Sequence, residues 1–310
     1  MSKQHRIVGI GELLWDLLPG GKQLGGAPAN FAVMSARLGN HGVIASRIGK
    51  DQLGKEALAR LSAFPADLSY LQTDSQHPTG SVSVALHQGQ AEYVFHSPVA
   101  WDFLECTPEW RELAQQADAV CFGTLAQRND VSRKTVAAFL EATAPDCVRV
   151  FDVNLRRPHF DAEVIAESLR KATLMKLNDA EMPPVLALLG LALECGLDEA
   201  SLLKGAKLLL DKFPLSLVCI TMGPLGSLLV TCDAHDRHHG FAAKVADTVG
   251  AGDAFTAALV HYYLQGAPLS VLNEAGNRWG AWVAAQPGAM PDLPEEVREE
   301  IEAGIRQAAG

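Results

Sequence analysis

The sequence lacks any apolar run that could cross a membrane, since a transmembrane helix needs about 20 consecutive apolar residues. Residues 1–6 lead directly into the apolar segment 7–10, which is too short for the hydrophobic region of a signal peptide. Internal repeats and low-complexity segments are also missing. We therefore expect a soluble, cytoplasmic protein with no membrane partner.

Cysteine occurs, but not in the patterns that bind metal or build a disulfide scaffold. No Cys-x-x-Cys pair is present, and no cysteine has the spacing to histidine that is typical of a zinc site. We expect reduced and mostly buried thiols. The six cysteines are Cys106, Cys121, Cys147, Cys195, Cys219 and Cys232.

Positive charge is in the minority, with 26 Lys and Arg against 36 Asp and Glu and a formal net charge of -10. A nucleic-acid partner is not expected, because binding the phosphate backbone needs a basic face. A single nucleotide stays possible, since backbone N–H groups, a few cations and magnesium can neutralise one triphosphate. The acidic segment 295–302 is expected to be a solvated helix face.

The chain is long and apolar enough for a large core, with 310 residues of which 48% are hydrophobic. Strand-like and helix-like segments alternate, which is typical of an α/β fold with a mostly parallel sheet and helices on both faces. The predicted strands are 6–10, 42–48, 119–122, 148–153, 174–177, 217–221 and 227–231. The predicted helices are 29–38, 53–63, 132–142, 162–171, 179–188, 199–212, 252–264, 269–285 and 295–308.

Two regions interrupt this alternation. Residues 81–87 and 91–97 are β-rich and are joined by a short loop with a glycine, which predicts a hairpin. Extended segments at 12–18 and 22–24 flank Pro19-Gly20-Gly21. We predict that these strands form a small sheet that acts as a lid. The lid would comprise 12–24 and 79–97, and the α/β core 1–11, 25–78 and 98–310.

The segment 245–255 is the most informative one for function. Its Gly250-Ala251-Gly252-Asp253 run precedes apolar residues with helical spacing, which predicts a loop that opens a helix. Free N–H groups at a helix start bind anions, and glycine lets an anion approach the backbone. A carboxylate at such a position suggests a base beside a transferred phosphoryl group. Ordinary capping of the helix is the alternative.

Five further motifs accompany this loop. They are Gly-Glu-Leu-Leu-Trp-Asp at 11–16, Gly-Gly-Ala-Pro-Ala-Asn-Phe-Ala at 25–32, Asp-Val-Asn-Leu-Arg at 152–156, Asn-Asp-Ala-Glu at 178–181 and Thr-Met-Gly-Pro-Leu-Gly at 221–226. Together with 247–253 they resemble, in order and spacing, the ribokinase-like (pfkB) carbohydrate kinases. The first two motifs are most similar to those of fructokinases, since ribokinases usually carry Lys-Gly where this chain has Ala27-Pro28. The resemblance covers nearly the whole chain and implies a three-layer α/β/α core with a small β-sheet lid.

The resemblance implies that Asp253 is the catalytic base. It accepts the proton of a sugar hydroxyl, and the loop of Gly250, Ala251 and Gly252 forms the anion hole for the transferred phosphoryl group.

The resemblance also implies the sugar site. Asp16 and Asn30 would bind sugar hydroxyls, although turn and helix capping would explain them too. Gly25 and Gly26 match the hinge of the lid, with a simple turn as the alternative. Arg156 would reach the sugar or the transferred phosphate, or would lie at the surface.

On the predicted hairpin, Tyr93 and Phe95 share one face, which we expect to cover the sugar.

For the nucleotide and metal ions, the resemblance implies ATP and Mg²⁺ as cofactors. Asn178 and Glu181 would order magnesium through water, and capping is again the alternative. Potassium would be held by three positions, although Asp292 replaces the serine that is frequent in the family. The ATP-binding residues are Asn178, Thr221, Gly223, Gly226 and Asn277, and the potassium positions are Asp247, Val249 and Gly288.

These features predict an ATP-dependent sugar kinase that phosphorylates a primary hydroxyl of a ketose, most simply fructose to fructose 6-phosphate. The same motifs fit kinases of 2-keto-3-deoxygluconate, ribose or a nucleoside, because specificity depends on pocket shape. A catalytically idle relative that binds sugar or nucleotide is a third interpretation. Exposed lid edges also suggest a homodimer formed through the lid.

Overall fold

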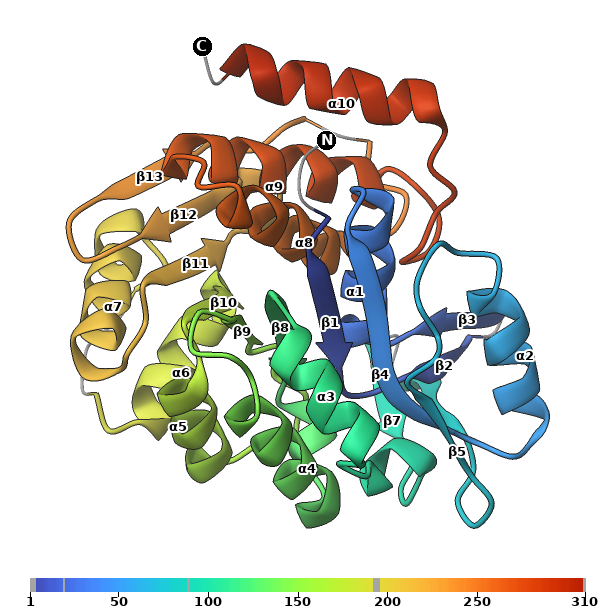
Figure 1. Ribbon diagram of the computed structural model, residues 1–310. Helices are drawn as coiled ribbons and strands as arrows, with labels where there is room; N and C mark the ends of the chain where they lie inside the picture. Colours follow the sequence, from blue (N-terminus) through green and yellow to red (C-terminus); the bar gives the residue numbers. More distant parts are fainter. Residues whose placement is uncertain (1–3, 19, 88–89, 192–195, 243, 309–310) are drawn as a thin grey trace.

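The computed structural model describes residues 4–18, 20–87, 90–191, 196–242 and 244–308, with 84–87 and 90–93 described by their backbone alone. A nine-stranded sheet runs through the molecule in the order β13-β12-β11-β10-β9-β8-β1-β4-β5 (Figure 1). Its strands are β1 (Arg6–Ile10), β4 (His41–Gly49), β5 (Leu71–Asp74), β8 (Ala119–Gly123), β9 (Val148–Asp152), β10 (Leu174–Asn178), β11 (Leu217–Thr221), β12 (Ser227–Val230) and β13 (His235–His238).

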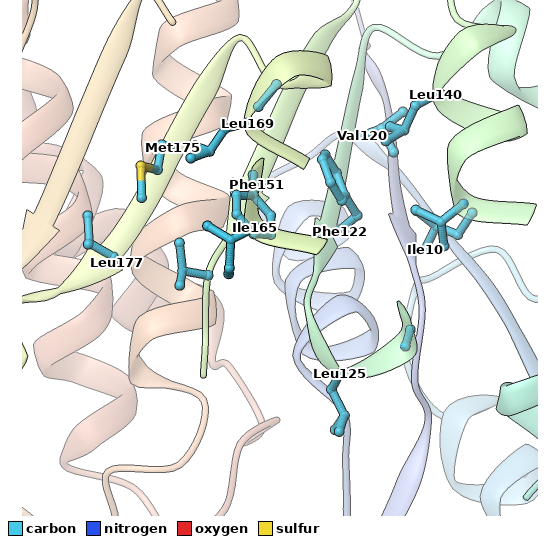
Figure 2. Packing of buried hydrophobic residues seen from close by; sticks show 14 of the residues in the cluster. Ile10, Val120, Phe122, Leu125, Leu140, Phe151, Ile165, Leu169, Met175 and Leu177 are labelled. Carbon is cyan, nitrogen blue, oxygen red and sulfur yellow. The ribbon is translucent and has the colours of Figure 1, made fainter. Parts of the chain in front are cut away.

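The sheet is parallel from β11 to β5, and β12 and β13 run antiparallel at one edge. Alternate residues of a strand point to opposite faces, so apolar strands such as β1 feed two cores. Ile7 packs in the core on one face, and Val8 and Ile10 pack in the core on the other. In the second core, Phe122 and Phe151 stack with their ring centroids 5.4 Å apart (Figure 2).

Helices cover both faces of this sheet. One core includes residues of α3 to α7, and the other includes residues of α1, α8, α9 and α10. The predicted three-layer α/β/α architecture is therefore confirmed. The helices are α1 (Ala27–Arg37), α2 (Gln52–Leu61), α3 (Pro108–Gln116), α4 (Asp130–Glu141), α5 (Ala162–Lys171), α6 (Met182–Leu188), α7 (Glu199–Lys212), α8 (Ala251–Leu264), α9 (Leu269–Ala284) and α10 (Glu295–Ala308).

Most predicted elements are confirmed, with ends that differ by a few residues. The patterns did not indicate β5, α3 or β13. The last of these is an edge strand with the polar sequence His-Asp-Arg-His, and α3 is a largely polar helix that buries only Trp110, Leu113 and Ala114. Such segments escape detection because they contribute little apolar periodicity. None of the helices over the described ranges is both long and apolar enough to cross a membrane.

The predicted small sheet is also present. It has the order β3-β2-β6-β7, with β2 (Leu14–Leu18), β3 (Gly21–Gly25), β6 (Gly80–His87) and β7 (Gln90–Phe95). Leu13, Trp15 and Leu24 share an apolar cluster with residues of α1, β4 and α2. The indole N–H of Trp15 donates to the Leu53 carbonyl at 3.0 Å. The small sheet therefore rests on the same helix, α1, that flanks the central strands.

Candidate active site

A cavity of about 1140 Å³ lies at the carboxyl ends of the central strands. Its wall includes Glu12 after β1, Asn154 after β9, Asn178 at the end of β10 and Thr221 at the end of β11. The start of α8 closes one side, and residues of the small sheet close another. Ligands of open α/β folds bind at this edge, where the carboxyl ends of parallel strands meet.

The Gly250–Asp253 loop forms the start of α8, as predicted. Gly250 is the N-cap in the left-handed region at φ 80°, and no side chain in the described part of the chain caps this helix. A Cβ at Gly250 would lie 2.6 Å from Cα of Ala289, so only glycine fits. The N–H of Ala251 donates to the Thr248 carbonyl at 3.3 Å. Because Asp253 does not cap its own helix, the first-turn N–H groups of Gly252 and Asp253 stay available to an anion in the cavity.

Asp253 lines the cavity and is held by a residue from the other end of the chain. Its Oδ2 accepts a hydrogen bond from Nδ2 of Asn30 at 2.7 Å. Enclosure by protein raises the pKa of Asp253 to about 6, and the negative charge of Asp152 adds to the rise. Lys176, Asn30 and Arg156 act in the opposite direction. A carboxyl with this pKa is suited to accept a proton near neutral pH.

A buried ion pair lies beside the Gly250–Asp253 loop. Nζ of Lys176 is 3.1 Å from both carboxylate oxygens of Asp152, and a Cβ at Gly252 would lie 2.9 Å from that Nζ. Although burial alone would lower the pKa of Lys176, Asp152 and Asp253 raise it above its usual range. Lys176 therefore brings a permanent positive charge to the cavity wall behind the loop.

Most of the residues predicted to bind sugar meet in the cavity. Asp16, Gly26, Asn30, Phe95 and Arg156 line its wall. Gly25 is outside this wall, but a Cβ there would lie 3.1 Å from Oδ2 of Asp16. Tyr93 lies outside the residues whose side chains the structure describes. Burial raises the pKa of Asp16, and the nearby Arg156 guanidinium partly offsets the rise.

The residues predicted to bind nucleotide line the same cavity, namely Asn178, Thr221, Gly223, Gly226 and Asn277. Nδ2 of Asn277 donates to Oγ of Ser227 at 2.7 Å. Ser227 directly follows the 221–226 loop, so the Asn277 side chain is anchored next to that loop. Gly226 has φ 88°, and a Cβ there would lie 2.0 Å from the His238 carbonyl oxygen. This loop therefore depends on glycine for its close packing.

Glu181 does not belong to the described cavity wall. Its Oε1 accepts the N–H of Leu155 at 2.6 Å, and its Oε2 accepts the N–H of Asn178 at 2.9 Å. The side chain of Asn178 accepts the N–H of Glu181 in return, which completes a capping box. The pair therefore has the capping geometry that was the alternative interpretation, and only Asn178 faces the cavity.

The three predicted potassium positions are linked by hydrogen bonds to Asp247. The carboxylate of Asp247 accepts the N–H of Val249 at 3.0 Å and the N–H of Gly288 at 3.2 Å. Asp247 and Val249 line the cavity, whereas Gly288 does not. Across the described residues, no group of three or more His, Cys, Asp or Glu side chains is arranged to hold a metal ion.

Lys176 and Glu12 also line the cavity, although the motifs predicted no role for either. The charge of Lys176 stands out among the apolar residues Leu174, Met175 and Leu177 of β10, which is a signal that sequence reasoning could have used. Glu12 follows the apolar strand β1 within the motif 11–16, yet it is only 3% exposed. Buried carboxyl and ammonium groups at a strand end are unusual enough to mark a site.

Known proteins resemble this chain over nearly its whole length. A family model for pfkB family carbohydrate kinases matches residues 20–296. A fructokinase of Escherichia coli is 30% identical over 322 residues, covering 94% of this chain and 97% of that protein. The structure of an uncharacterized sugar kinase of Pyrococcus horikoshii in complex with ATP superposes with a TM-score of 0.80 at 27% identity. The structure of a Vibrio cholerae fructokinase with bound fructose, ADP and calcium superposes with a TM-score of 0.78 at 26% identity. Each match covers 97% of this chain and 99% of the other chain. The chain belongs to the pfkB family of carbohydrate kinases.

Proposed function

We propose that this carbohydrate kinase transfers the γ-phosphate of ATP to a primary hydroxyl of a ketose, converting fructose to fructose 6-phosphate. The observation that carries the proposal is the placement of Asp253 at an uncapped helix start, held by Asn30 and facing the cavity. The names of the related fructokinases, and fructose and ADP in one of the solved structures, support this substrate.

In the proposed reaction, the hydroxyl oxygen attacks the γ-phosphorus while its proton passes to the carboxylate of Asp253. The bond between the γ-phosphorus and the bridging oxygen breaks, and ADP leaves. The backbone N–H groups of Gly252 and Asp253 stabilise charge on the transferred group, with the Lys176 ammonium beside Gly252. Arg156 also lies on the cavity wall, and we expect it to contact the sugar or the transferred phosphate.

The residues present fit magnesium only indirectly. Asn178 faces the cavity, whereas both carboxylate oxygens of Glu181 already accept backbone N–H groups. Mg²⁺ would therefore be bound by phosphate oxygens and water near Asn178, and when bound it neutralises phosphate charge. The same proposal includes a potassium ion held by Asp247, Val249 and Gly288, and a lid formed by residues 12–24 and 79–97. It also includes a cytoplasmic location and a homodimer that forms through the lid.

An ATP-consumption assay over ketoses, aldoses, 2-keto-3-deoxygluconate and nucleosides tests the proposal. We expect the highest kcat/KM with fructose. Turnover of another substrate without turnover of fructose would contradict the substrate but leave the kinase mechanism standing. No turnover with any acceptor would favour an idle relative, an interpretation that the presence of Asp253 and the loop glycines disfavours.

We expect kcat/KM for the sugar to fall as the pH drops through about 6. Asp253 accepts a proton only when ionised, and its pKa is raised to about 6. At about pH 5, roughly one molecule in ten would therefore carry the reactive form. Steady-state kinetics between about pH 5 and 8 would measure this dependence, and a profile that is flat down to about pH 5 would contradict the role of Asp253.

Substituting Gly226 should weaken nucleotide binding selectively. In Gly226→Ala the new Cβ would lie 2.0 Å from the His238 carbonyl oxygen, so the loop must shift. We expect KM for ATP to rise about tenfold or more, with KM for the sugar unchanged. Gly223→Ala is the matched control, because Gly223 also has a positive φ, of 54°, but a Cβ there would meet no atom of the described residues within 4 Å. Equal effects of the two substitutions would refute this explanation.

A further inference from the structure

Glu12 is a buried acid in the wall of the cavity. The side chain is 3% exposed and lines the wall, and its Oε2 has no hydrogen-bond partner among the described residues. An unpartnered buried polar atom costs about 1–3 kcal/mol. Such a cost is typical of a site where a ligand supplies the missing partner.

The backbone around Glu12 is closely packed. A Cβ at Gly26 would lie 2.4 Å from the Glu12 carbonyl oxygen, and one at Gly9 would lie 1.9 Å from the Pro28 carbonyl oxygen. The end of β1 and the start of α1 therefore touch through backbone alone. Glu12 is held beside the helix turn that carries Asn30, since the Asn30 N–H donates to the Gly26 carbonyl at 2.9 Å.

A second unused acceptor lies in the same wall. Oδ1 of Asn30 is buried without a partner in the described part of the molecule, while Nδ2 of the same amide donates to Asp253. Both free atoms, in Glu12 and Asn30, are oxygens that accept hydrogen bonds. A polyol offers hydroxyl donors to both, whereas a carboxylate or phosphate offers only acceptors.

The charges around Glu12 favour the same kind of ligand. Burial, the largest cause, raises the pKa of Glu12 to about 7, and Asp253 raises it further while Arg156 lowers it. Asp16 lies in the wall of the same cavity. An anionic sugar in this cavity would meet three carboxyl groups, of Glu12, Asp16 and Asp253, which repel it whenever they are ionised, against the guanidinium groups of Arg156 and Arg157.

We propose that Glu12 is a further sugar-binding residue, whose free oxygen accepts a hydroxyl of the sugar and which selects neutral polyols over anionic sugar acids. The inference rests on the proposed function, because it assumes that the acceptor binds beside Glu12 in this cavity. It distinguishes the favoured ketose from 2-keto-3-deoxygluconate, which carries a carboxylate.

The test compares Glu12→Gln and Glu12→Leu with the unmodified protein, using fructose, 2-keto-3-deoxygluconate and ATP. We expect Glu12→Leu to raise KM for fructose about tenfold to a hundredfold, the loss of one hydrogen bond to a charged group, with KM for ATP unchanged. Glu12→Gln keeps an acceptor oxygen and should recover part of the affinity. The ratio of kcat/KM for the sugar acid to that for fructose should rise in both variants.

Thermal unfolding separates this role from a structural one. Because Glu12 leaves a buried oxygen unpaired among the described residues, Glu12→Leu should keep or raise Tm while sugar binding is lost. Asp74→Asn is the matched control, since the Asp74 carboxylate is also buried but is bonded to the backbone N–H groups of Gln76 and His77. We expect that control to lower Tm and leave KM for the sugar unchanged.

Two results would overturn the inference. One is an unchanged KM for fructose in Glu12→Leu, and the other is a lowered Tm with proportional loss of all activities. Either result with a fructose-active unmodified protein would leave the proposed function intact. If the unmodified protein phosphorylates only the sugar acid, the proposed substrate and the role of Glu12 both fail, and the substrate panel identifies this case independently of the variants.

Discussion

Asp253→Asn should lower kcat by about 10²- to 10⁴-fold, because the amide cannot accept the proton of the attacking hydroxyl. The substitution keeps the size of the side chain, and the amide oxygen can still accept the hydrogen bond from Nδ2 of Asn30. We therefore expect a folded protein with nearly unchanged KM values. Loss of activity with intact binding is the signature of a group that acts in the transition state.

Steady-state kinetics measures kcat and the KM values, and calorimetric titration with the nucleotide measures its binding. Asn30→Leu is the matched comparison, since it removes the donor to Asp253 but leaves the carboxylate. Because that donor lowers the pKa of Asp253, its loss should move the acid limb of the pH profile upward. A fully active Asp253→Asn enzyme would refute the proposed mechanism.

Lys176→Met should lower the free energy of unfolding by about 3–5 kcal/mol, which is the usual cost of leaving one member of a buried ion pair alone. The pair is well enclosed, with the side chains of Lys176 and Asp152 11% and 4% exposed. The pKa of Asp253 should rise, since the positive charge of Lys176 lowers it and the charge of Asp152 would remain. Urea unfolding and the pH profile of kcat/KM measure the two effects.

Two companion variants make this prediction specific. Asp152→Asn removes the opposite charge, so the pKa of Asp253 should fall and the acid limb should move downward. Lys176→Met combined with Asp152→Leu leaves no unpaired charge in place of the pair, so much of the lost stability should return. Shifts of the acid limb in the same direction for both single variants would show that Lys176 and Asp152 do not act on Asp253 through charge.

The layered fold could be predicted because buried parallel strands and amphipathic helices leave strong local patterns. The strand 217–221 and the helices 162–171 and 199–212 were predicted with their actual bounds. The strand β13 could not be predicted, since its stability comes from pairing with β12 and not from its own polar residues.

The sequence predicted which residues form the candidate site, but not the contacts between them. Motif spacing brought Asp16, Asn30 and Asp253 together, and all three line the cavity. The hydrogen bond between Asn30 and Asp253 was not predictable, because no local pattern relates residues so far apart. The roles of Lys176 and Glu12 were not predicted for a related reason, since burial and missing hydrogen-bond partners are properties of the folded chain.

The position of β1 in the middle of the sheet has a consequence for the order of folding. This strand pairs with β4 and β8, so its pairing cannot be completed until residue 121 has been synthesised. The hydrogen bond from Asn30 to Asp253 joins residues that are 223 positions apart in the sequence. A nascent chain can therefore assemble β1, β4 and β8 early, but the proposed base Asp253 takes its place beside Asn30 only after α8 has been synthesised and has docked.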